Sequence, residues 1–240
     1  MEVTQEIVKI NTGLEGFDRL LHGGLPKGYS YLVSGEPGTG KTIFCLQYLL
    51  EGLKQGEKAI YISIDEQPDH VIIDAQALGW DLSGYLNSGQ LQIMDVSQYF
   101  NSVSDTKNFD IQQVVSDMLS YVKSNGVTRL AIDPVAPLIF TESAYPNVIA
   151  YIRQLIFALE DNIGCTTLLT SYVPVGSEKL SNFGVEEFAA SGIISLKLVR
   201  QNNKRIRSIG VRKMRRTRID LTEYSFEILS DRGIVLRQPL

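Results

Sequence analysis

The chain has few of the residues that form cross-links or metal clusters. Its 240 residues include two cysteines, two histidines and one tryptophan. Cys45 and Cys165 are too few for a disulfide framework or a four-ligand zinc site, so we expect them to be buried, reduced thiols. An uncharged apolar run of about 20 residues, the length that crosses a bilayer, is lacking as well. The polar, acidic start 1–6 does not resemble a secretion signal. We therefore expect a soluble, cytoplasmic protein.

An excess of positive charge is also lacking. The formal net charge is −4 and the sequence pI is about 5.3, which argues against bulk attraction to nucleic acid or to an anionic membrane. The hydrophobic content of 44% over 240 residues is enough for one large core. Because no internal repeat or convincing linker interrupts the chain, we expect a single domain over residues 1–240.

One complete phosphate-binding motif stands out against these absences. It is Gly35-Glu36-Pro37-Gly38-Thr39-Gly40-Lys41-Thr42, which fits G-x-x-x-x-G-K-[ST] and directly follows a strand-like run. Glycines in such a loop let backbone N–H groups turn inward around the phosphates, while Lys41 adds a positive charge. The hydroxyl of Thr42, in the first turn of the helix that follows, is placed to ligate Mg²⁺. The motif predicts that the chain binds a nucleoside triphosphate.

Strand-like and helix-like segments alternate through most of the chain. Apolar residues at helical spacing predict helices over 41–54, 68–78, 110–124 and 147–161. Short apolar runs predict buried strands over 58–64, 91–95, 129–133 and 165–171. This alternation predicts an α/β fold with a mainly parallel sheet and helices on both faces.

The pattern changes near residue 193. From there, strand-like runs follow one another with only short turns between them, at 193–200, 205–214, 224–229 and 234–237. Such a series predicts antiparallel hairpins that extend one edge of the sheet. The stretch 97–110, which is rich in Ser, Asn and Asp, predicts a mobile surface loop.

Acidic residues follow two of the predicted strands. Asp133 ends the strand 129–133, the kind of position from which phosphate-loop proteins hold Mg²⁺ or its waters. Asp65 and Glu66 come directly after the strand 58–64. A carboxylate there is placed to orient or deprotonate an attacking water. Acidic residues also commonly cap a following helix, so spacing alone leaves both roles open for this pair.

Several motifs together resemble the KaiC family. The resemblance is carried by Thr12–Asp18, by Leu20–Gly28 leading into the phosphate loop, by Gly184–Phe188 and by Lys213-Met214-Arg215. It covers about residues 9–235 and corresponds to one KaiC domain, whereas the circadian clock protein carries two in tandem. The N-terminal run is shared more loosely with the RecA and RadA recombinases. The resemblance implies a RecA-like P-loop NTPase fold and a ring-forming ATPase, expected to be hexameric, with ATP at the subunit interfaces.

The resemblance also implies roles for single residues. Asp65 and Glu66 occupy the positions of the family's paired catalytic glutamates, and the first is one methylene shorter here. Lys213 and Arg215 match a basic pair that reaches the γ-phosphate of the neighbouring subunit's ATP. Cations supplied in this way stabilise the charge on the transferred phosphoryl group. Two further matches concern the nucleoside: Leu78 falls where the family places a side chain against adenine, and Asp231 resembles an acidic residue near the ribose or the base.

The basic pair belongs to a longer basic segment. Ten Lys or Arg residues and no acidic residue lie between Lys197 and Arg218. Three interpretations of this segment are open: the solvated face of a hairpin, an interface that contacts a neighbour's triphosphate, and a nucleic-acid-binding stripe. Because 192–218 contains no aromatic residue that would stack on bases, we favour the triphosphate interface over nucleic acid.

A further family property is autophosphorylation of adjacent serine and threonine residues after a Glu-Glu pair. Here Glu186-Glu187 is followed by Phe188-Ala189-Ala190-Ser191, so only Ser191 keeps a hydroxyl group. Phosphoryl transfer needs an acceptor in line with the γ-phosphate. Plain hydrolysis is therefore favoured over self-kinase activity.

The sequence thus predicts an ATPase with ATP and Mg²⁺ in its site. Lys41 and the loop amides would hold the phosphates, Thr42 and Asp133 the metal, and Glu66 with Asp65 would activate water. The expected partner is another copy of the chain, a regulatory protein partner is left open, and neither nucleic acid nor a membrane is expected.

Two alternatives from other functional classes stay open. One is a RadA-like, DNA-binding recombination accessory, which the fold and the basic segment support. The other is a nucleotide-sensing scaffold that binds ATP to assemble but hydrolyses it very slowly. The shorter side chain of Asp65 supports this alternative.

Overall fold

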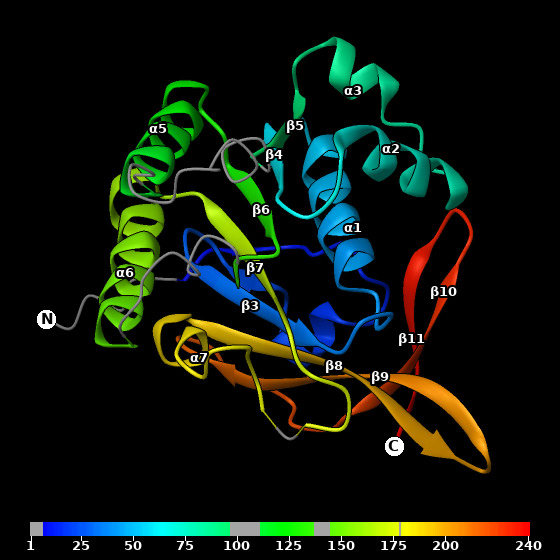
Figure 1. The fold of residues 1–240 in the computed structure, drawn as a ribbon. Helices are drawn as coiled ribbons and strands as arrows, with labels where there is room; N and C mark the ends of the chain where they lie inside the picture. The colour runs from blue at the N-terminus through cyan, green and yellow to red at the C-terminus, as the bar shows by residue number, and fades with distance from the viewer. Residues whose placement is uncertain (1–6, 97–110, 137–144, 178) are drawn as a thin grey trace, which may run out of the picture.

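A nine-stranded mixed sheet forms the centre of the chain (Figure 1). The computed structural model describes residues 7–96, 111–136, 145–177 and 179–240. The strand order is β11-β10-β9-β8-β3-β7-β6-β4-β5. The parallel part comprises β3 (Ser30–Gly35), β4 (Ala59–Ser63), β5 (Leu91–Asp95), β6 (Arg129–Asp133), β7 (Thr166–Tyr172) and β8 (Gly192–Gln201). The antiparallel part comprises β9 (Lys204–Met214), β10 (Tyr224–Leu229) and β11 (Gly233–Pro239). The predicted mainly parallel sheet with C-terminal antiparallel strands is confirmed.

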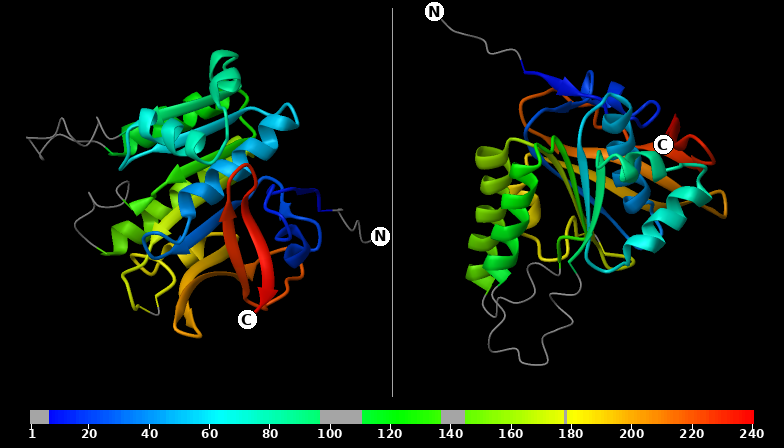
Figure 2. Two further views of the ribbon diagram at one scale, coloured as in Figure 1. Left: turned by 90° about the vertical axis from the view of Figure 1, so that its right-hand side faces the viewer. Right: turned by 90° about the horizontal axis from the view of Figure 1, so that it is seen from above.

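Helices cover both faces of this sheet (Figure 2). One face carries α1 (Lys41–Lys54), α2 (Pro68–Ala77) and α3 (Ser83–Asn87). The other carries α5 (Ile111–Ser124) and α6 (Tyr145–Phe157), and α6 runs on into the π-helical segment Ala158–Ile163. Successive strand residues point to opposite faces, so Tyr61 of β4 packs in the core under α1 while Ile60 and Ile62 pack in the core under α5 and α6.

The predicted helices agree with the observed ones to within a few residues at their ends. Burial confirms the periodicity on α5, where Val115, Met118 and Val122 are buried, and on α6, where Ile152 and Leu155 are buried. Each apolar stripe faces the sheet because that position removes the most apolar surface from water. The predicted loop 97–110 lies outside the described residues.

The parallel part of the sheet extends one strand further than predicted. β8 begins the first C-terminal hairpin, as expected, but it pairs in parallel with β3, with Gly35 opposite Leu196. β7 ends at one end of the parallel strands, and β8, which follows the short helix α7 (Glu186–Ala189), begins at the opposite end. β8 therefore enters in the same direction as β3, as a crossover connection requires.

A small N-terminal unit lies beside the sheet. β1 (Lys9–Ile10) pairs with β2 (Leu25–Pro26), and the 3₁₀ turn Asp18–Leu21 lies between them. Gly24 is needed there, because a Cβ atom would lie 2.2 Å from the carbonyl oxygen of Ile10. This pair of strands was not predicted from the sequence.

The two cysteines are free and buried, as predicted. Within the described ranges no helix combines the length and the apolar character needed to cross a bilayer.

Candidate functional site

The phosphate loop, residues 35–42, connects the C-terminal end of β3 to the start of α1. A Cβ atom at Gly35 would lie 2.5 Å from the carbonyl oxygen of Leu196 on the adjacent strand. Gly38 and Gly40 have φ angles of 79° and 104°, which other residues rarely adopt. The first turn of α1 leaves backbone N–H groups without intrahelical partners, and these face the loop. The segment therefore has the backbone of an anion-binding loop.

Lys41 lies along the inside of this loop. Its ammonium donates to the carbonyl oxygens of Gly35 at 2.8 Å and Glu36 at 3.1 Å. Burial lowers the pKa of Lys41, and the charge of Asp133 partly opposes that change. An ammonium has three N–H donors, and these two contacts leave one for an anion bound in the loop.

Asp133, at the end of β6, gathers hydroxyl groups from three neighbouring elements. Its Oδ2 accepts hydrogen bonds from Thr42 Oγ1 at 2.7 Å and from the Tyr61 hydroxyl at 2.6 Å, and its Oδ1 accepts one from Thr170 Oγ1. The structure thus brings together Thr42 and Asp133, the two side chains expected from the sequence to hold a metal. Carboxylate and hydroxyl oxygens are hard ligands of the kind that Mg²⁺ prefers.

Tyr61 and Thr170 were not identified from the sequence. Both lie inside apolar strands, on β4 and β7, and both are buried. Burial and the nearby charge of Asp133 hold the pKa of Tyr61 well above its usual value, so the phenol stays protonated and donates to the carboxylate. Their sequence positions did carry one signal: a polar group inside a buried strand needs a hydrogen-bond partner.

Asp65 and Glu66 follow β4 at the same edge of the sheet as Asp133. The backbone N–H of Ile64 donates to the carbonyl oxygen of Asp133 at 3.2 Å, which ties the start of this turn to the end of β6. Burial and the charge of Asp133 raise the pKa of Asp65. Burial, with the charges of Asp74 and Asp133, likewise raises the pKa of Glu66. Carboxylates with raised pKa values are better proton acceptors near neutral pH.

A cavity of about 420 Å³ lies beside the phosphate loop. Gly40, Lys41 and Thr42 line one part of it, and apolar side chains that include Leu78 and Ile228 line another. Asp231 does not belong to the described lining. Its backbone N–H donates to the carbonyl oxygen of Leu78 at 2.7 Å, so it fastens the β10–β11 turn to the end of α2 behind the cavity wall. Of the two predicted nucleoside contacts, only Leu78 lines the cavity.

Arg207, a residue of β9, also lines this cavity. Its Nε donates to the carbonyl oxygen of Gly38 at 3.2 Å. The strand pairing explains the contact: Arg207 lies opposite Leu198 of β8, two residues beyond the position that pairs with Gly35. Within the sequence Arg207 is one of ten basic residues and nothing distinguishes it, because only the register of β9 brings it to the loop.

Lys213 and Arg215 lie at the other end of β9. Lys213 pairs with Ile193, which lies opposite Leu32 near the middle of β3. Its ammonium donates to three carbonyl oxygens around α7, those of Glu187 at 2.8 Å, Phe188 at 3.3 Å and Ala190 at 2.7 Å. The Arg215 guanidinium donates to the Phe188 carbonyl oxygen at 3.3 Å. The structure does not bring these cations to the phosphate loop of their own chain.

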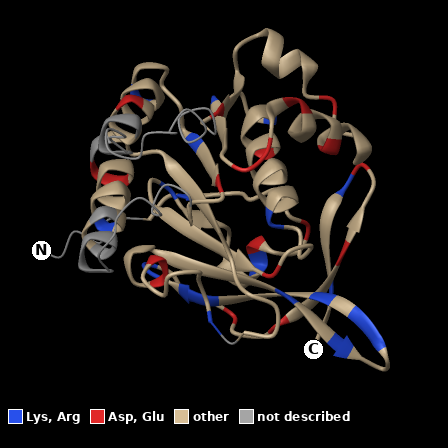
Figure 3. Cartoon of the chain, viewed as in Figure 1, with Lys and Arg blue, Asp and Glu red and all other residues tan. Residues whose placement is uncertain are grey.

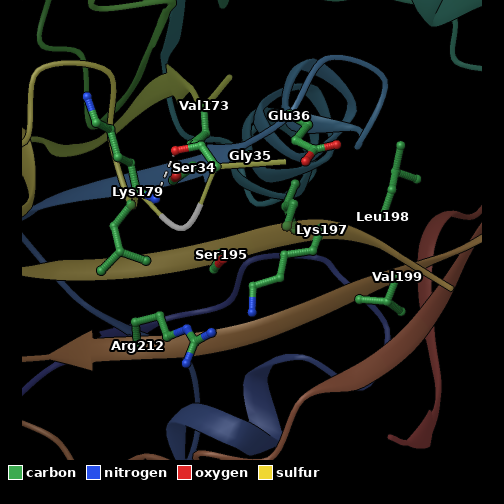
Figure 4. A pocket seen from close by; sticks show the side chains of 13 residues that line it. Ser34, Gly35, Glu36, Val173, Lys179, Ser195, Lys197, Leu198, Val199 and Arg212 are labelled. Atoms are coloured by element: carbon green, nitrogen blue, oxygen red, sulfur yellow. Dashed lines mark hydrogen bonds between the residues drawn. The ribbon is translucent and has the colours of Figure 1, made fainter. Parts of the chain in front are cut away.

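Two other cations of the basic segment, Lys197 and Arg212, are already paired. Positive residues are concentrated along the β8–β9 hairpin (Figure 3). A second cavity, of about 530 Å³, lies between this hairpin and the start of the phosphate loop (Figure 4). In it, Lys197 and Arg212 approach each other and both bind Glu223, at 2.7 and 2.9 Å. Their charge is therefore partly neutralised within the chain.

Ser191 is buried, with 2% of its surface exposed. Its hydroxyl donates to Glu160 Oε1 at 3.1 Å, and its backbone N–H donates to the Ser30 carbonyl oxygen at 2.8 Å. A buried hydroxyl with these contacts is not presented to a phosphate donor.

The chain is similar to known proteins over almost its whole length. Residues 10–240 match the family model described as "ATPase: KaiC". A UPF0273 protein of Thermotoga maritima is 34% identical over 242 residues, which cover 96% of each chain. The circadian clock oscillator protein KaiC of Thermosynechococcus vestitus is 34% identical over 224 residues, 93% of this chain and 43% of that one. The chain therefore spans less than half the length of the clock proteins that it matches.

A solved structure supports the same relationship. The KaiC-like protein PH0186 of Pyrococcus horikoshii OT3 has a TM-score of 0.84 and 30% sequence identity, with 97% of this chain and 100% of that one covered. The predicted RecA-like fold is thereby confirmed. The fold, the phosphate loop and these similarities agree, and the chain belongs to the KaiC family of ATPases.

Proposed function

We propose that this chain, as a single domain over residues 1–240, is a Mg²⁺-dependent ATPase that assembles into a ring with ATP at the interfaces between subunits. One observation carries the proposal. Thr42, at the end of the phosphate loop, and Asp133, 91 residues away at the end of β6, meet at 2.7 Å beside Lys41. These are the groups that a triphosphate and its metal require, and two separate segments of the chain supply them.

The residues present fit ATP and Mg²⁺. The glycine backbone of the phosphate loop and the remaining donor of Lys41 would hold the phosphates. Thr42 and Asp133 would hold Mg²⁺, directly or through its waters, and the ion when bound neutralises charge on the phosphate oxygens. Leu78 and Ile228 would pack against the base. We assign Asp231 to the support of Leu78, and Arg207 to a further phosphate contact from the same chain.

Glu66, with Asp65, would activate the water. Both carboxylates follow β4 beside Asp133, and both have raised pKa values. The water oxygen attacks the γ-phosphorus while the bond from that phosphorus to the β–γ bridging oxygen breaks. The proton of the water goes to the carboxylate. Positioning and electrostatic stabilisation supply most of the rate enhancement in such a transfer.

Lys213 and Arg215 would act on a neighbouring subunit. Six residues of extended strand, about 20 Å, separate Arg207 at the phosphate loop from Lys213. The two cations therefore cannot serve the same triphosphate as Arg207 within one chain. A ring of identical subunits, six by analogy with the family, would bring this end of β9 to the next phosphate loop, because a head-to-tail contact joins two different surfaces of the same chain and forms a ring when its rotation closes.

Mixed assemblies test this proposal. Lys41→Ala removes phosphate binding, whereas Lys213→Ala/Arg215→Ala removes the donated cations, so each variant alone should release little phosphate. Mixed in equal amounts, they should regain part of the activity, because an intact phosphate loop then meets intact cations at some interfaces. Size measurements with ATP and Mg²⁺ must show that both variants assemble. Assembly of both without any regain would contradict interfacial catalysis.

A second candidate is the nucleotide-sensing scaffold. It is favoured by Asp65, which is exposed and has the shorter side chain. Nucleotide-dependent assembly without phosphate release would identify it.

The DNA-binding alternative has less support, since Glu223 forms ion pairs with Lys197 and Arg212. We also propose that Ser191 is not a phosphorylation site, which intact-mass measurement after incubation with ATP and Mg²⁺ would check.

A further inference from the structure

The helix α7 holds the two cations that face away from their own phosphate loop. A lysine ammonium has three N–H donors, and Lys213 uses all three on the carbonyl oxygens of Glu187, Phe188 and Ala190. Arg215 adds one donor to the Phe188 carbonyl oxygen. These carbonyls have no intrahelical partners at the end of so short a helix, and they attract positive charge. The place of α7 therefore sets the place of both cations.

A buried carboxylate anchors α7. Glu186, its first residue, has 1% of its surface exposed. It accepts from Ser171 Oγ at 3.2 Å, from the Val185 backbone N–H at 3.2 Å and from the Phe183 backbone N–H at 3.4 Å. Within the described part of the chain it has no ion-pair partner. A carboxylate, which only accepts, suits three converging donors, whereas an amide would turn an N–H group toward some of them.

The anchor point on β7 lies next to the site of the phosphate loop. Thr170 and Ser171 are neighbours on this strand, so their side chains point to opposite faces. Thr170 donates to Asp133, and Ser171 donates to Glu186. The C-terminal end of β7 thus contacts both Asp133, the predicted metal ligand, and Glu186, the first residue of α7.

We infer that Glu186 is a positioning residue, which places Lys213 and Arg215 for the neighbouring subunit by fixing α7 to the end of β7. This inference rests on the proposed interfacial role of the two cations. The segment Gly184–Phe188 would thereby contribute to catalysis, although this segment lies away from the phosphate loop of its own chain. The carbonyl oxygens themselves cannot be removed by substitution, so the anchor is the group to change.

Mixed assemblies can place Glu186→Gln in either kind of subunit. The cations that act come from the Lys41→Ala subunit, whereas ATP is hydrolysed in the Lys213→Ala/Arg215→Ala subunit. In the cation-donating subunit, Glu186→Gln should lower the regained phosphate release by about ten- to a hundredfold, the cost of a misplaced catalytic group. In the ATP-holding subunit it should leave the regained activity unchanged. The second placement is the matched control, because the same substitution is present in the same assembly.

The outcomes separate this inference from the proposed function. If the mixture without Glu186→Gln regains no activity, the interfacial role of the cations fails, and the inference fails with it. If that mixture works but Glu186→Gln has no effect, or the same effect in both placements, Glu186 is structural and only the inference is overturned. Binding of a fluorescent ATP analogue to the cation-donating Glu186→Gln protein, measured without the Lys41→Ala change, should match the unsubstituted chain.

Ser171→Ala keeps the test decisive if Glu186→Gln does not fold. This change removes the hydroxyl donor on β7 but leaves the two backbone donors to Glu186 in place. It should reproduce the placement-dependent loss, to a smaller extent. Combined in the cation-donating subunit, the two changes should lower activity by less than the product of their separate effects, since both break one contact. A full product would contradict the inference.

Discussion

The cations at the two ends of β9 differ in what they contact within the chain. At one end Arg207 reaches the phosphate loop, where Lys41, Thr42 and Asp133 already contact their partners within the chain. At the other end, among the described residues, the Lys213 and Arg215 side chains donate to neutral carbonyl oxygens of 187–190, and the charge of Glu187 acts on Lys213 as well. Carbonyl groups satisfy hydrogen bonds but do not cancel the charge. The first end lies at the phosphate loop of its own chain, whereas in the proposed ring the second end would be supplied to the site of the neighbouring subunit.

The proposed ring would combine these two ends, each from a different subunit, in one active site. A triphosphate with Mg²⁺ needs cations on the transferred phosphoryl group, and the phosphate-loop end supplies Lys41 and Arg207. β9, which ends at Met214, connects the two ends; it pairs with β8 along its length and with β10 at 207–209. Substitutions at the two ends should therefore differ in what they remove.

The largest effect is expected at the phosphate loop. Lys41→Ala removes a positive charge inside the loop, and phosphate release should fall by about a thousandfold together with ATP affinity. Lys54→Ala, in the last turn of the same helix and exposed, is the matched control and should retain both. Hydrolysis that survives Lys41→Ala would show that catalysis does not use this loop.

At the other end of β9, Lys213→Ala should separate catalysis from binding. Phosphate release should fall by about a hundredfold, because a cation directed at the developing charge is lost. Binding of a fluorescent ATP analogue to the subunit's own loop should stay within about twofold of the unsubstituted chain. A parallel loss of affinity and rate in the unassembled protein would place Lys213 in its own site and remove the contrast.

A pH profile tests the carboxylates that follow β4. A carboxylate must be deprotonated to accept a proton, so the rate should fall as the pH drops through the raised pKa of Glu66, above its usual range. Glu66→Gln should lower the rate by about a hundredfold and remove that acidic limb. Asp65→Asn should have the smaller effect on both. If only Asp65→Asn removes the limb, the shorter acid is the base.

The smallest effect is expected one residue from Lys213. Arg212 is 43% exposed and is bound to Glu223, which keeps its contact with Lys197. Arg212→Ala should leave phosphate release unchanged and lower the free energy of unfolding by less than about 1 kcal/mol, as measured by denaturant titration. A catalytic loss as large as that of Lys213→Ala would mean that the whole basic strand, rather than one pair, acts on the neighbouring site.

Much of the site could be predicted because its parts are local. The phosphate loop needs eight adjacent residues of fixed types, and Asp133 needs only a strand before it. Tyr61 and Thr170 differ, since each is an ordinary polar residue until Asp133, far along the chain, gives it a contact. Glu186 lies in the motif Gly184–Phe188, but the motif does not show that Ser171 of β7 binds its side chain. The direction of β8 was missed for a related reason, since a hairpin pattern shows that β8 pairs with β9 but not which strand lies on its other side.

The sequence by itself determined the alternation of strands and helices, the phosphate loop and the family resemblance, because periodicity and motif spacing are written in neighbouring residues. Only the tertiary structure decided which end of β9 each cation occupies. Strand order in this sheet does not follow chain order, with β3 between β8 and β7, so register sends Arg207 to the loop of its own chain and Lys213 to α7. The physical reason is that a strand's reach is fixed at about 3.3 Å per residue, and its two ends cannot meet in one site.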